Sequence, residues 1–257
     1  ILSNSQFEKF LDFFKKNIRI LDCTFDTKKG LKKRLDDLRS EAEISVREGG
    51  KHLILSDKKI NENKVAIPMI LAIGAINSRL VDLGIRGFAS INIQTSEAFD
   101  THSFAVLLGV GATTINPYIV LDSIHQRYQK NLFGKLSFEE SVKRYIKSVD
   151  NGLLKIMSKM GISVLSSYRG GSNFEAVGLS RSVVAEYFPG MISRISGIGI
   201  KGLEKKIREI HEKAFQKNVS ILPIGGIYKY RKNGETHQYQ GRLIHLLQSA
   251  VSSNSYK

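Results

Sequence analysis

Basic and hydroxyl side chains that could do chemistry gather on one predicted helix of the sequence. On a helix over residues 153–160, Lys155, Ser158 and Lys159 would share one face, because residues three and four apart are neighbours on a helix. Gly161 follows and is the natural residue to end such a helix. The arrangement could hold a phosphate, help to build a nucleophilic site, or form one structural unit of a larger machine.

The residues that follow could bind an anion. Residues 162–168 are predicted as a short strand, and the glycine pair at 170–171 would relax the backbone after it. Ser172-x-x-Glu175 is a capping box, so it predicts a helix N-terminus with free N–H groups beside Arg169. However, Glu175 would occupy one of those donors, and no third glycine would let a phosphate approach. We therefore favour a structural strand–helix unit whose basic residues face a neighbouring surface, with an anion site as the alternative.

A second glycine motif is interpreted as structural. Residues 197–202 spell G-x-G-x-x-G, the pattern of dinucleotide-binding turns, which also needs a buried strand before it and an acid about twenty residues later. The preceding residues 191–196 make a poor strand pattern, and residues 213–234 contain no Asp or Glu. The motif is therefore predicted to be the turn that starts a helix over 203–217.

Two further groups of polar residues carry no chemistry in this interpretation. Residues 56–59 fit S-x-x-K without its companion motifs, so a strand-end turn is predicted. Glu97, Asp100 and His102 lie close in sequence but lack a second histidine at metal-ligand spacing. They are predicted to be solvated residues that cap a helix.

The positive net charge raises the question whether the chain binds nucleic acid, and the distribution of the basic residues argues against it. Among 257 residues, Lys and Arg number 39 and Asp and Glu 24, for a formal net charge of +15. The basic residues are dispersed beside acids, and no arginine-rich tract or basic–aromatic platform is present. We predict no nucleic-acid role; a module of that kind would show salt-sensitive binding to polyanions.

Cysteine content and hydropathy restrict the setting of the chain. Cys23 is the lone cysteine, which excludes an intramolecular disulfide and fits a reducing compartment. No secretory segment and no apolar run of about twenty residues is present, so we expect neither export nor a membrane location. The chain begins with Ile1 rather than Met, and we expect it to be a piece of something longer.

Short apolar strands alternate with helices along the sequence, which predicts parallel βα units. The predicted strands are 52–56, 88–95, 113–116 and 162–168; the predicted helices are 7–14, 31–48, 68–83, 99–109, 118–128, 137–149, 153–160, 203–217 and 241–251. Residues 150–152 are predicted to break a helix, and the Asn-Gly turn within 228–239 predicts a hairpin. The fold class is therefore α/β, a mostly parallel sheet flanked by helices, with a C-terminal helical and hairpin portion.

Several segments together resemble the large chain of glutamate synthase. They are "LDCTFD" (21–26), "LILSDKKI" (53–60), "AIPMILAIGAINSRLVDLGIR" (66–86), "QTSEAFDTHSFAVLLGVGATTINPY" (94–118), "GLLKIMSKMGIS" (152–163), "SYRGGSNFEAVGLS" (167–180), "SRISGIGI" (193–200) and "GETHQY…LIHLLQSAV" (234–251). They occur in the family's order and cover nearly the whole chain. One local departure is "IQTSE", with Gln94 and Ser96, where relatives often show Val-Glu-Thr-Gly-Glu.

The resemblance implies a central domain, an open sheet or degenerate barrel, over residues 1–257 with its own N-terminal part trimmed. The parent enzyme is an oxidoreductase acting on CH–NH2 donors, and its amidotransferase, FMN-binding and β-helix domains would lie outside this chain. FMN and a 3Fe–4S cluster belong to the parent, so no catalytic, cofactor-binding or metal residue is expected here. The expected partners are the other domains of the same chain and, for the parent, a small electron-donating subunit or ferredoxin. The expected location is the cytoplasm, or a plastid.

The resemblance also implies a role next to an ammonia path. The parent releases ammonia from glutamine and uses it, at the FMN site, to convert 2-oxoglutarate to glutamate. A central domain would separate the two sites and contribute wall to the path, so the isolated chain is expected to be inactive and to expose surfaces that the parent buries. The Ser/Thr-rich strand ends at 113–116 and 163–167 would offer such a path neutral hydrogen-bonding groups. The candidate interdomain or tunnel residues are Asn116, Lys155, Lys159, Ser163, Tyr168 and Arg169. The alternative is a free-standing anion- or flavin-binding α/β enzyme that uses the 169–175 loop.

Overall fold

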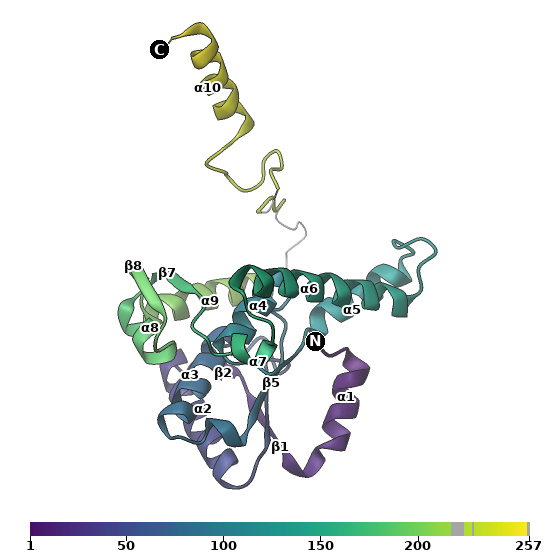
Figure 1. The fold of residues 1–257 in the computed structure, drawn as a ribbon, viewed down its shortest axis with the longest axis vertical. Coiled ribbons are helices and arrows are strands. Elements are labelled where there is room, and N and C mark those ends of the chain that lie inside the picture. The colour runs from purple at the N-terminus through teal and green to yellow at the C-terminus, as the bar shows by residue number, and fades with distance from the viewer. Residues whose placement is uncertain (217–223, 228, 256–257) are drawn as a thin grey trace. The chain divides into compact units, whose positions relative to one another are not determined.

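The core of the protein is an open four-stranded parallel sheet (Figure 1). The computed structural model describes residues 1–216, 224–227 and 229–255, in two units, 1–214 and 215–257. The strands lie in the order β1 (Ile18–Asp22), β3 (His52–Ser56), β5 (Ser90–Gln94) and β6 (Thr114–Asn116). The predicted α/β class with a mostly parallel sheet is confirmed, and the strands at 52–56, 88–95 and 113–116 are found with small changes at their ends.

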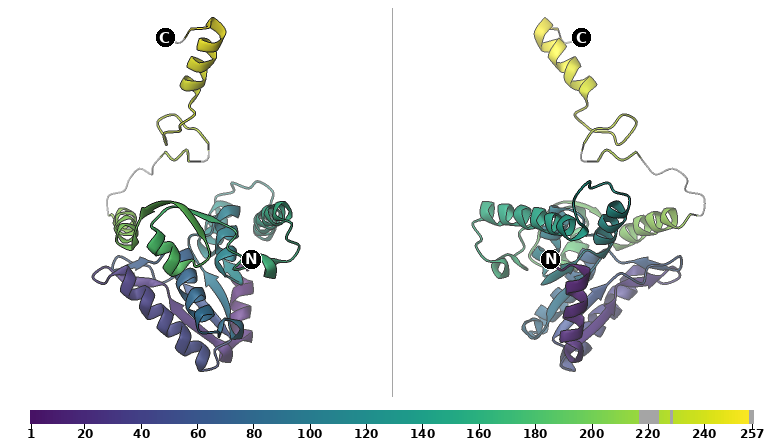
Figure 2. Two further views of the ribbon diagram at one scale, coloured as in Figure 1. Left: turned by 60° about the vertical axis from the view of Figure 1, so that its left-hand side comes forward. Right: turned by 90° about the vertical axis from the view of Figure 1, so that its right-hand side faces the viewer.

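Three helices cover one face of this sheet (Figure 2). They are α2 (Leu31–Arg47), α3 (Met69–Asp82) and α4 (Thr101–Val110), each of which leads into the next parallel strand. Because the strand order advances in one direction, right-handed crossovers place all three connecting helices on the same side. The row of residues in register beneath them is apolar and buried: Leu21, Leu55, Ile93 and Ile115. This layer is the hydrophobic core.

The opposite face of the sheet is more polar, and α1 (Asn4–Phe13) lies against it. A capping box between Ser3 and Gln6 starts this helix. Its Phe10 and Phe14 rings contact the His52 ring, at centroid distances of 5.3 and 4.2 Å. In the middle of this face, the polar residue Asn92 is in register with Ile54 and is buried.

The remaining elements of the first unit are shorter or lie outside the sheet. They are η1 (Lys15–Asn17), β2 (Thr24–Asp26), β4 (Lys64–Ala66), η2 (Arg86–Phe88), α5 (Tyr118–Gln129), α6 (Phe138–Met160), α7 (Leu165–Tyr168), β7 (Glu175–Leu179), α8 (Arg181–Tyr187), β8 (Ile192–Ile198) and α9 (Ile200–Ala214). β2 and β4 form an antiparallel pair, and β7 and β8 form a parallel pair. The second unit contains α10 (Gly241–Ser253), which confirms the helix predicted at 241–251.

Helix α6 differs from the sequence prediction because packing overrides a local break signal. It runs without interruption through residues 150–152. Gly152 fits there because α4 is close: a Cβ on Gly152 would lie 2.5 Å from the side chain of Thr101. The glycine at this position therefore lets α6 contact α4 closely and does not end the helix. Gly161 ends the helix in a left-handed conformation, as predicted.

The predictions for residues 162–175 give the wrong type of secondary structure. The expected strand at 162–168 is a loop followed by α7, and the expected helix start at Ser172 is an irregular turn that leads into β7. Ser172 has a positive φ of 52°, whereas an N-cap residue typically has extended φ/ψ angles. The Gly170 N–H donates to the Gly109 carbonyl at 2.9 Å, so the loop is fixed to the end of α4. A contact with a distant segment, which the local pattern does not contain, sets this conformation.

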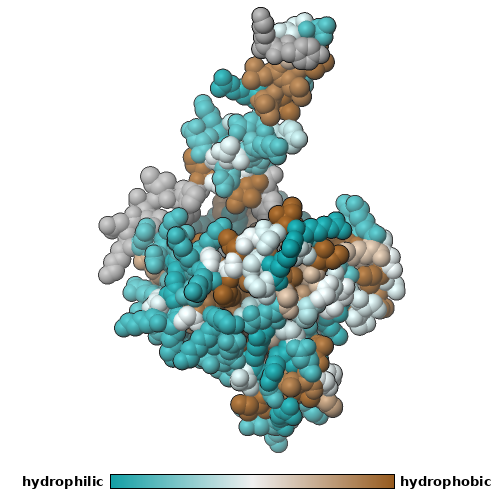
Figure 3. All heavy atoms as spheres, turned by 90° about the vertical axis from the view of Figure 1, so that its left-hand side faces the viewer, coloured by the Kyte–Doolittle hydropathy of each residue, from teal (hydrophilic) through white to brown (hydrophobic). Residues whose placement is uncertain are grey.

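The second glycine motif does follow a strand, contrary to the prediction. β8 precedes it and α9 begins at Ile200. A Cβ on Gly197 would lie 2.0 Å from the Gly178 carbonyl oxygen, so this glycine lets β8 approach β7 closely. The pattern at 191–196 is weak because most of β8 is exposed, including Ile195. Figure 3 shows apolar atoms among hydrophilic ones on this side of the first unit.

The predicted hairpin does not form in the part of 228–239 that the structure describes. Position 228 lies outside the described residues, and 229–239 contain turns and no strand. Asn233 has a positive φ of 63°, but the Gly234 N–H donates to the Arg231 carbonyl at 3.0 Å, so the turn is centred on Lys232 and Asn233 and not on the predicted Asn-Gly pair. Across the described ranges, no helix combines the length and the apolar character that crossing a lipid bilayer would need.

Candidate functional site

A row of polar side chains lies at the carboxyl edge of the parallel sheet. The last residues of the four strands are in register: Asp22, Ser56, Gln94 and Asn116. The Ser56 hydroxyl donates to Gln94 Oε1 at 2.8 Å, and the Gln94 amide donates to Asn116 Oδ1 at 3.4 Å. Open α/β sheets bind ligands outside this edge, so the row is the natural place to look for function. Its three members from β3, β5 and β6 are uncharged.

Asp57 lies directly behind the row and is completely buried. Its Oδ2 accepts hydrogen bonds from the Thr95 hydroxyl at 2.8 Å, the Ser96 N–H at 2.8 Å and the Ser96 hydroxyl at 3.0 Å. Its Oδ1 has no hydrogen-bond partner among the described residues. Tyr118 lies beside this carboxylate; burial, followed by the charge of Asp57, raises the pKa of its hydroxyl. The loop after β5 thus holds a buried negative charge.

Glu97 joins the same loop to another helix. Its carboxylate accepts the Met69 N–H at 2.7 Å and so caps the N-terminus of α3, while its own N–H donates to the Thr95 hydroxyl at 3.2 Å. Burial by surrounding protein, reinforced by the charge of Asp57, raises the pKa of Glu97 to about 7, although part of the side chain reaches solvent. Glu97 is exposed and caps a helix N-terminus, so it is a solvated cap as predicted, although the helix is α3 and not the one that follows it in sequence. Asp100 caps α4 by accepting the Ser103 N–H.

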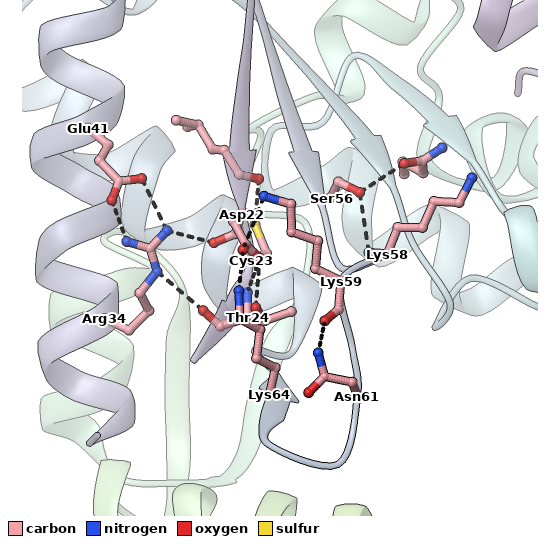
Figure 4. A network of polar contacts seen from close by, with 12 residues as sticks. Asp22, Cys23, Thr24, Arg34, Glu41, Ser56, Lys58, Lys59, Asn61 and Lys64 are labelled. Carbon is pink, nitrogen blue, oxygen red and sulfur yellow. Dashed lines mark hydrogen bonds and ion pairs between the residues drawn. The ribbon is translucent and has the colours of Figure 1, made fainter. Parts of the chain in front are cut away.

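Ion pairs surround the other end of the row, at β1 (Figure 4). Asp22 accepts hydrogen bonds from the Thr24 N–H and hydroxyl, at 3.1 and 2.7 Å. The Lys59 and Lys64 ammonium groups lie 3.6 and 3.4 Å from its Oδ2. Burial raises the pKa of Asp22, but Thr24 and the lysines outweigh it and hold the pKa below its ordinary value. Arg34 donates to the Asp22 carbonyl at 2.7 Å and pairs with Glu41, which fixes the loop after β1.

The structure places only one of the predicted site residues in this row. Asn116 is buried, and its amide donates to the Leu2 carbonyl at 3.1 Å and to Asn4 Oδ1 at 2.9 Å. Lys155 and Lys159 are exposed on α6, as their shared face predicted, and Ser163 is exposed just after it. Residues 163–167, expected to be a neutral strand end, belong to a loop and to α7.

Tyr168 and Arg169 lie at the other edge of the sheet. Tyr168 is buried, and its hydroxyl lacks a hydrogen-bond partner in the described part of the chain. Burial, followed by the charge of Arg169, lowers the pKa of Arg86, whose guanidinium donates to the Ala89 and Gly111 carbonyls just before β5 and β6 begin. Asn116 is the last residue of β6, whereas Arg169 acts on Arg86 near the residues where β5 and β6 begin. Asn116 and Arg169 therefore lie at opposite ends of the strands. The 169–175 loop also lacks the helix start that an anion site required.

Neither metal ligation nor a resident cluster is supported by the chain's own side chains. Within the described ranges, no group of three or more His, Cys, Asp or Glu is arranged to hold a metal ion. Cys23 is fully buried, and burial raises the pKa of its thiol far above the ordinary value. Iron–sulfur clusters need several thiolates, so one neutral, enclosed thiol does not fit such a group.

Sequence comparisons connect this fold with known proteins. The family model described as glutamate synthase central domain matches residues 1–180. The chain belongs to this family. It is 48% identical over its whole length to the NADPH glutamate synthase large chain of Azospirillum brasilense, and 37% identical to that of Bacillus subtilis. It is also 37% identical to the chloroplastic ferredoxin-dependent glutamate synthase of rice. Each of these matches includes the whole of this chain and spans only 17% of the relative's length.

Sequence reasoning missed most of the polar cluster in this glutamate synthase central domain. Asp57 and Ser96 directly follow the strands predicted at 52–56 and 88–95, and Thr95 is the last residue of the second. The rule that carboxyl ends of parallel strands meet could therefore have selected them. The segment "IQTSE" was noted only as a departure from the family pattern. In the structure it supplies three of the hydrogen bonds to Asp57.

Proposed function

We propose that this chain is the central part of a glutamate synthase large chain and that it separates a glutaminase site from an FMN site. The family match and the identity over the whole chain support this role. In the proposed parent, glutamine yields ammonia, and the ammonia is used with 2-oxoglutarate to form glutamate. FMN and a 3Fe–4S cluster would be held by other domains, since Cys23 is enclosed. No catalytic step is assigned to residues of this chain, and alone it is expected to form no glutamate.

The uncharged row at the carboxyl edge supports a part in the ammonia path. Ammonia must stay neutral on its way, so a path needs hydrogen-bonding groups that do not protonate it and shelter from bulk water. Ser56, Gln94 and Asn116 supply such groups at 2.8 and 3.4 Å from one another. The nearest buried acid, Asp57, has one carboxylate oxygen occupied by three donors from the neighbouring loop. We propose that the row, rather than residues 163–167, contributes wall to the path.

The electrons for the parent reaction would come from outside this chain. The relatives include enzymes named for NADPH and for ferredoxin. Either a small electron-donating subunit or ferredoxin would therefore serve as the external partner, and the other domains of the parent would contact this one. A cytoplasmic or plastid location is part of the same proposal; the rice relative is named as chloroplastic.

The experiment compares two ways of supplying nitrogen to the longer natural protein. Gln94→Ala and Asn116→Ala should lower glutamine-dependent glutamate formation several-fold, while formation from added ammonia stays near the wild-type rate. Lys33→Ala, on the exposed face of α2, is the control and should change neither rate. Equal losses with both nitrogen sources would argue against a path at the row. A longer protein without glutamate synthase activity would overturn the proposed function as a whole.

A further inference from the structure

A large groove lies between the start of α1 and the antiparallel pair of α5 and α6. Its volume is about 810 Å³. Leu121, Phe138, Val142 and Ile146 form an apolar floor, and charged residues of both signs, including Asp122 and Lys147, form the rim. A cavity of roughly 150 Å³ accommodates a benzene molecule, so this groove has room for several apolar side chains. We call it the α5–α6 groove.

The floor of the α5–α6 groove is an apolar stripe that the chain leaves partly uncovered. Val142 and Ile146 are one helical turn apart on α6, and both are only half-buried. Amphipathic helices bury such a stripe against another element. Farther along the same helix, the stripe is buried: Val149 and Leu153 are 4% and 9% exposed. The first half of α6 therefore has an apolar face that the described residues cover only in part.

The chain's own N-terminal residues form one end of the groove. Ser3, Asn4, Ser5 and Gln6 line it, and the N-terminus lies close to α5 and α6 in both views (Figures 1 and 2). Asn4 donates to Asp122 at 3.3 Å and accepts from Asn116 at 2.9 Å, so it connects the groove to the row at the carboxyl edge. The Leu2 N–H donates to the Ile115 carbonyl at 2.9 Å, which fixes where the polypeptide enters.

We propose that the α5–α6 groove binds the polypeptide segment that immediately precedes residue 1 in the longer protein. This inference rests on the proposed function, because it requires a parent chain of which these residues are one part; the relatives are about six times as long. Any preceding residues join the chain at Ile1, two positions before Ser3, which lines the groove. The occupant is a short amphipathic helix with apolar side chains three or four residues apart, which fits the spacing of Val142 and Ile146. Such a segment would fix the preceding domain beside the polar row.

Cysteine labelling tests the proposal. Val142→Cys and Ile146→Cys would be labelled with a thiol reagent in the 257-residue chain and in the longer protein, and Ser148→Cys, exposed on the same helix, is the matched control. Cys23 is buried and gives a low background in the 257-residue chain; in the longer protein, peptide mapping assigns the label to its site. In the longer protein, labelling at 142 and 146 should be at least tenfold slower than in the 257-residue chain, and labelling at 148 should be unchanged. Circular dichroism of each variant verifies folding before labelling.

Deletions identify the occupant. Removing everything before residue 1 from the longer protein should restore fast labelling, and keeping only about twenty of those residues should keep it slow. Slow labelling that survives the full deletion would assign the groove to another domain and overturn the proposal. Protection of the 257-residue chain that grows with its concentration would assign it to a second copy and would also overturn it. A glutamate synthase assay of the same longer protein separates the two hypotheses, because protection without activity would reject only the proposed function.

Discussion

Replacing Asp57 by alanine should destabilise the fold more than any other single change at the candidate site. The Asp57 carboxylate is completely buried and accepts three hydrogen bonds from Thr95 and Ser96. These bonds join the end of β3 to the loop after β5, and that loop in turn caps α3 through Glu97. Alanine would leave two hydroxyl groups and one backbone N–H without their acceptor in the interior.

The expected loss can be worked out from opposing contributions. Each hydrogen bond to a charged group contributes about 1.5–3 kcal/mol, so three such bonds give roughly 4–9 kcal/mol. Removing the carboxylate also relieves its desolvation, which costs several kcal/mol for a buried ion and is larger here because Oδ1 has no partner among the described residues. We therefore expect Asp57→Ala to lower the free energy of unfolding by about 2–4 kcal/mol.

Urea unfolding of the 257-residue chain, followed by far-ultraviolet circular dichroism, measures this difference. Asp57→Asn keeps one acceptor oxygen for Thr95 and Ser96 and should cost about 1 kcal/mol. A double-mutant cycle with Thr95→Val should give a coupling energy of about 1–2 kcal/mol, since the pair is in direct contact. An Asp57→Ala variant as stable as Asp57→Asn would refute the reasoning, because the acceptor would then contribute nothing.

Three other outcomes follow from single residues. Gly197→Ala places a Cβ against the Gly178 carbonyl and should lower the free energy of unfolding in urea by about 1–3 kcal/mol. Gly199→Ala meets only ordinary contacts and should lower it by under about 1 kcal/mol. Equal losses would contradict the close approach of the strands. The raised pKa of Glu97 means that its contribution is fully present below pH 4.5 and is lost as pH rises through about 7. Relative to Glu97→Gln, wild-type stability should therefore fall over that range, by about 1 kcal/mol after solvent screening; a pH-independent difference would contradict the shift. Cys23 should resist thiol reagents until the chain is unfolded, and fast reaction in the native state would show that the core opens.

The sequence predicts the elements that build the sheet because their patterns are local. Residues 52–56 are apolar, short and bounded by polar turns, and β3 covers the same residues. The helix predicted at 241–251 is likewise found. Residues 162–168 mislead because apolar character there does not reflect burial: Val164 and Leu165 are 52% and 39% exposed. Their conformation depends on a hydrogen bond from Gly170 to Gly109, sixty-one positions earlier, which no local pattern encodes.

The candidate site is only partly predictable for the same reason. Asn116 could be selected because it ends a predicted strand. The pairing of Asp57 with Thr95 and Ser96 depends on which strands are neighbours and in what register, and thirty-eight residues separate the first pair. Strand order and register arise from the packing of the helices on one face of the sheet. A reader of the sequence alone can therefore locate strand ends but cannot tell which polar side chains meet.

At the carboxyl edge of the sheet, the acidic side chains and the neutral side chains have different partners, and this difference bears on function. The acids there are engaged by nearby groups of the chain: Asp22 by Thr24 and two lysines, Asp57 by Thr95 and Ser96, and Glu97 by the N-terminus of α3. The side chains that bond to one another along the edge, from Ser56 to Asn116, are neutral. A catalytic acid or base must come within hydrogen-bond reach of a reacting atom. Asp57 has one carboxylate oxygen without a partner among the described residues, but the side chain is completely buried. The same difference in partners would suit a wall along which a neutral molecule passes, and this is why we propose a passage rather than a reaction at this edge.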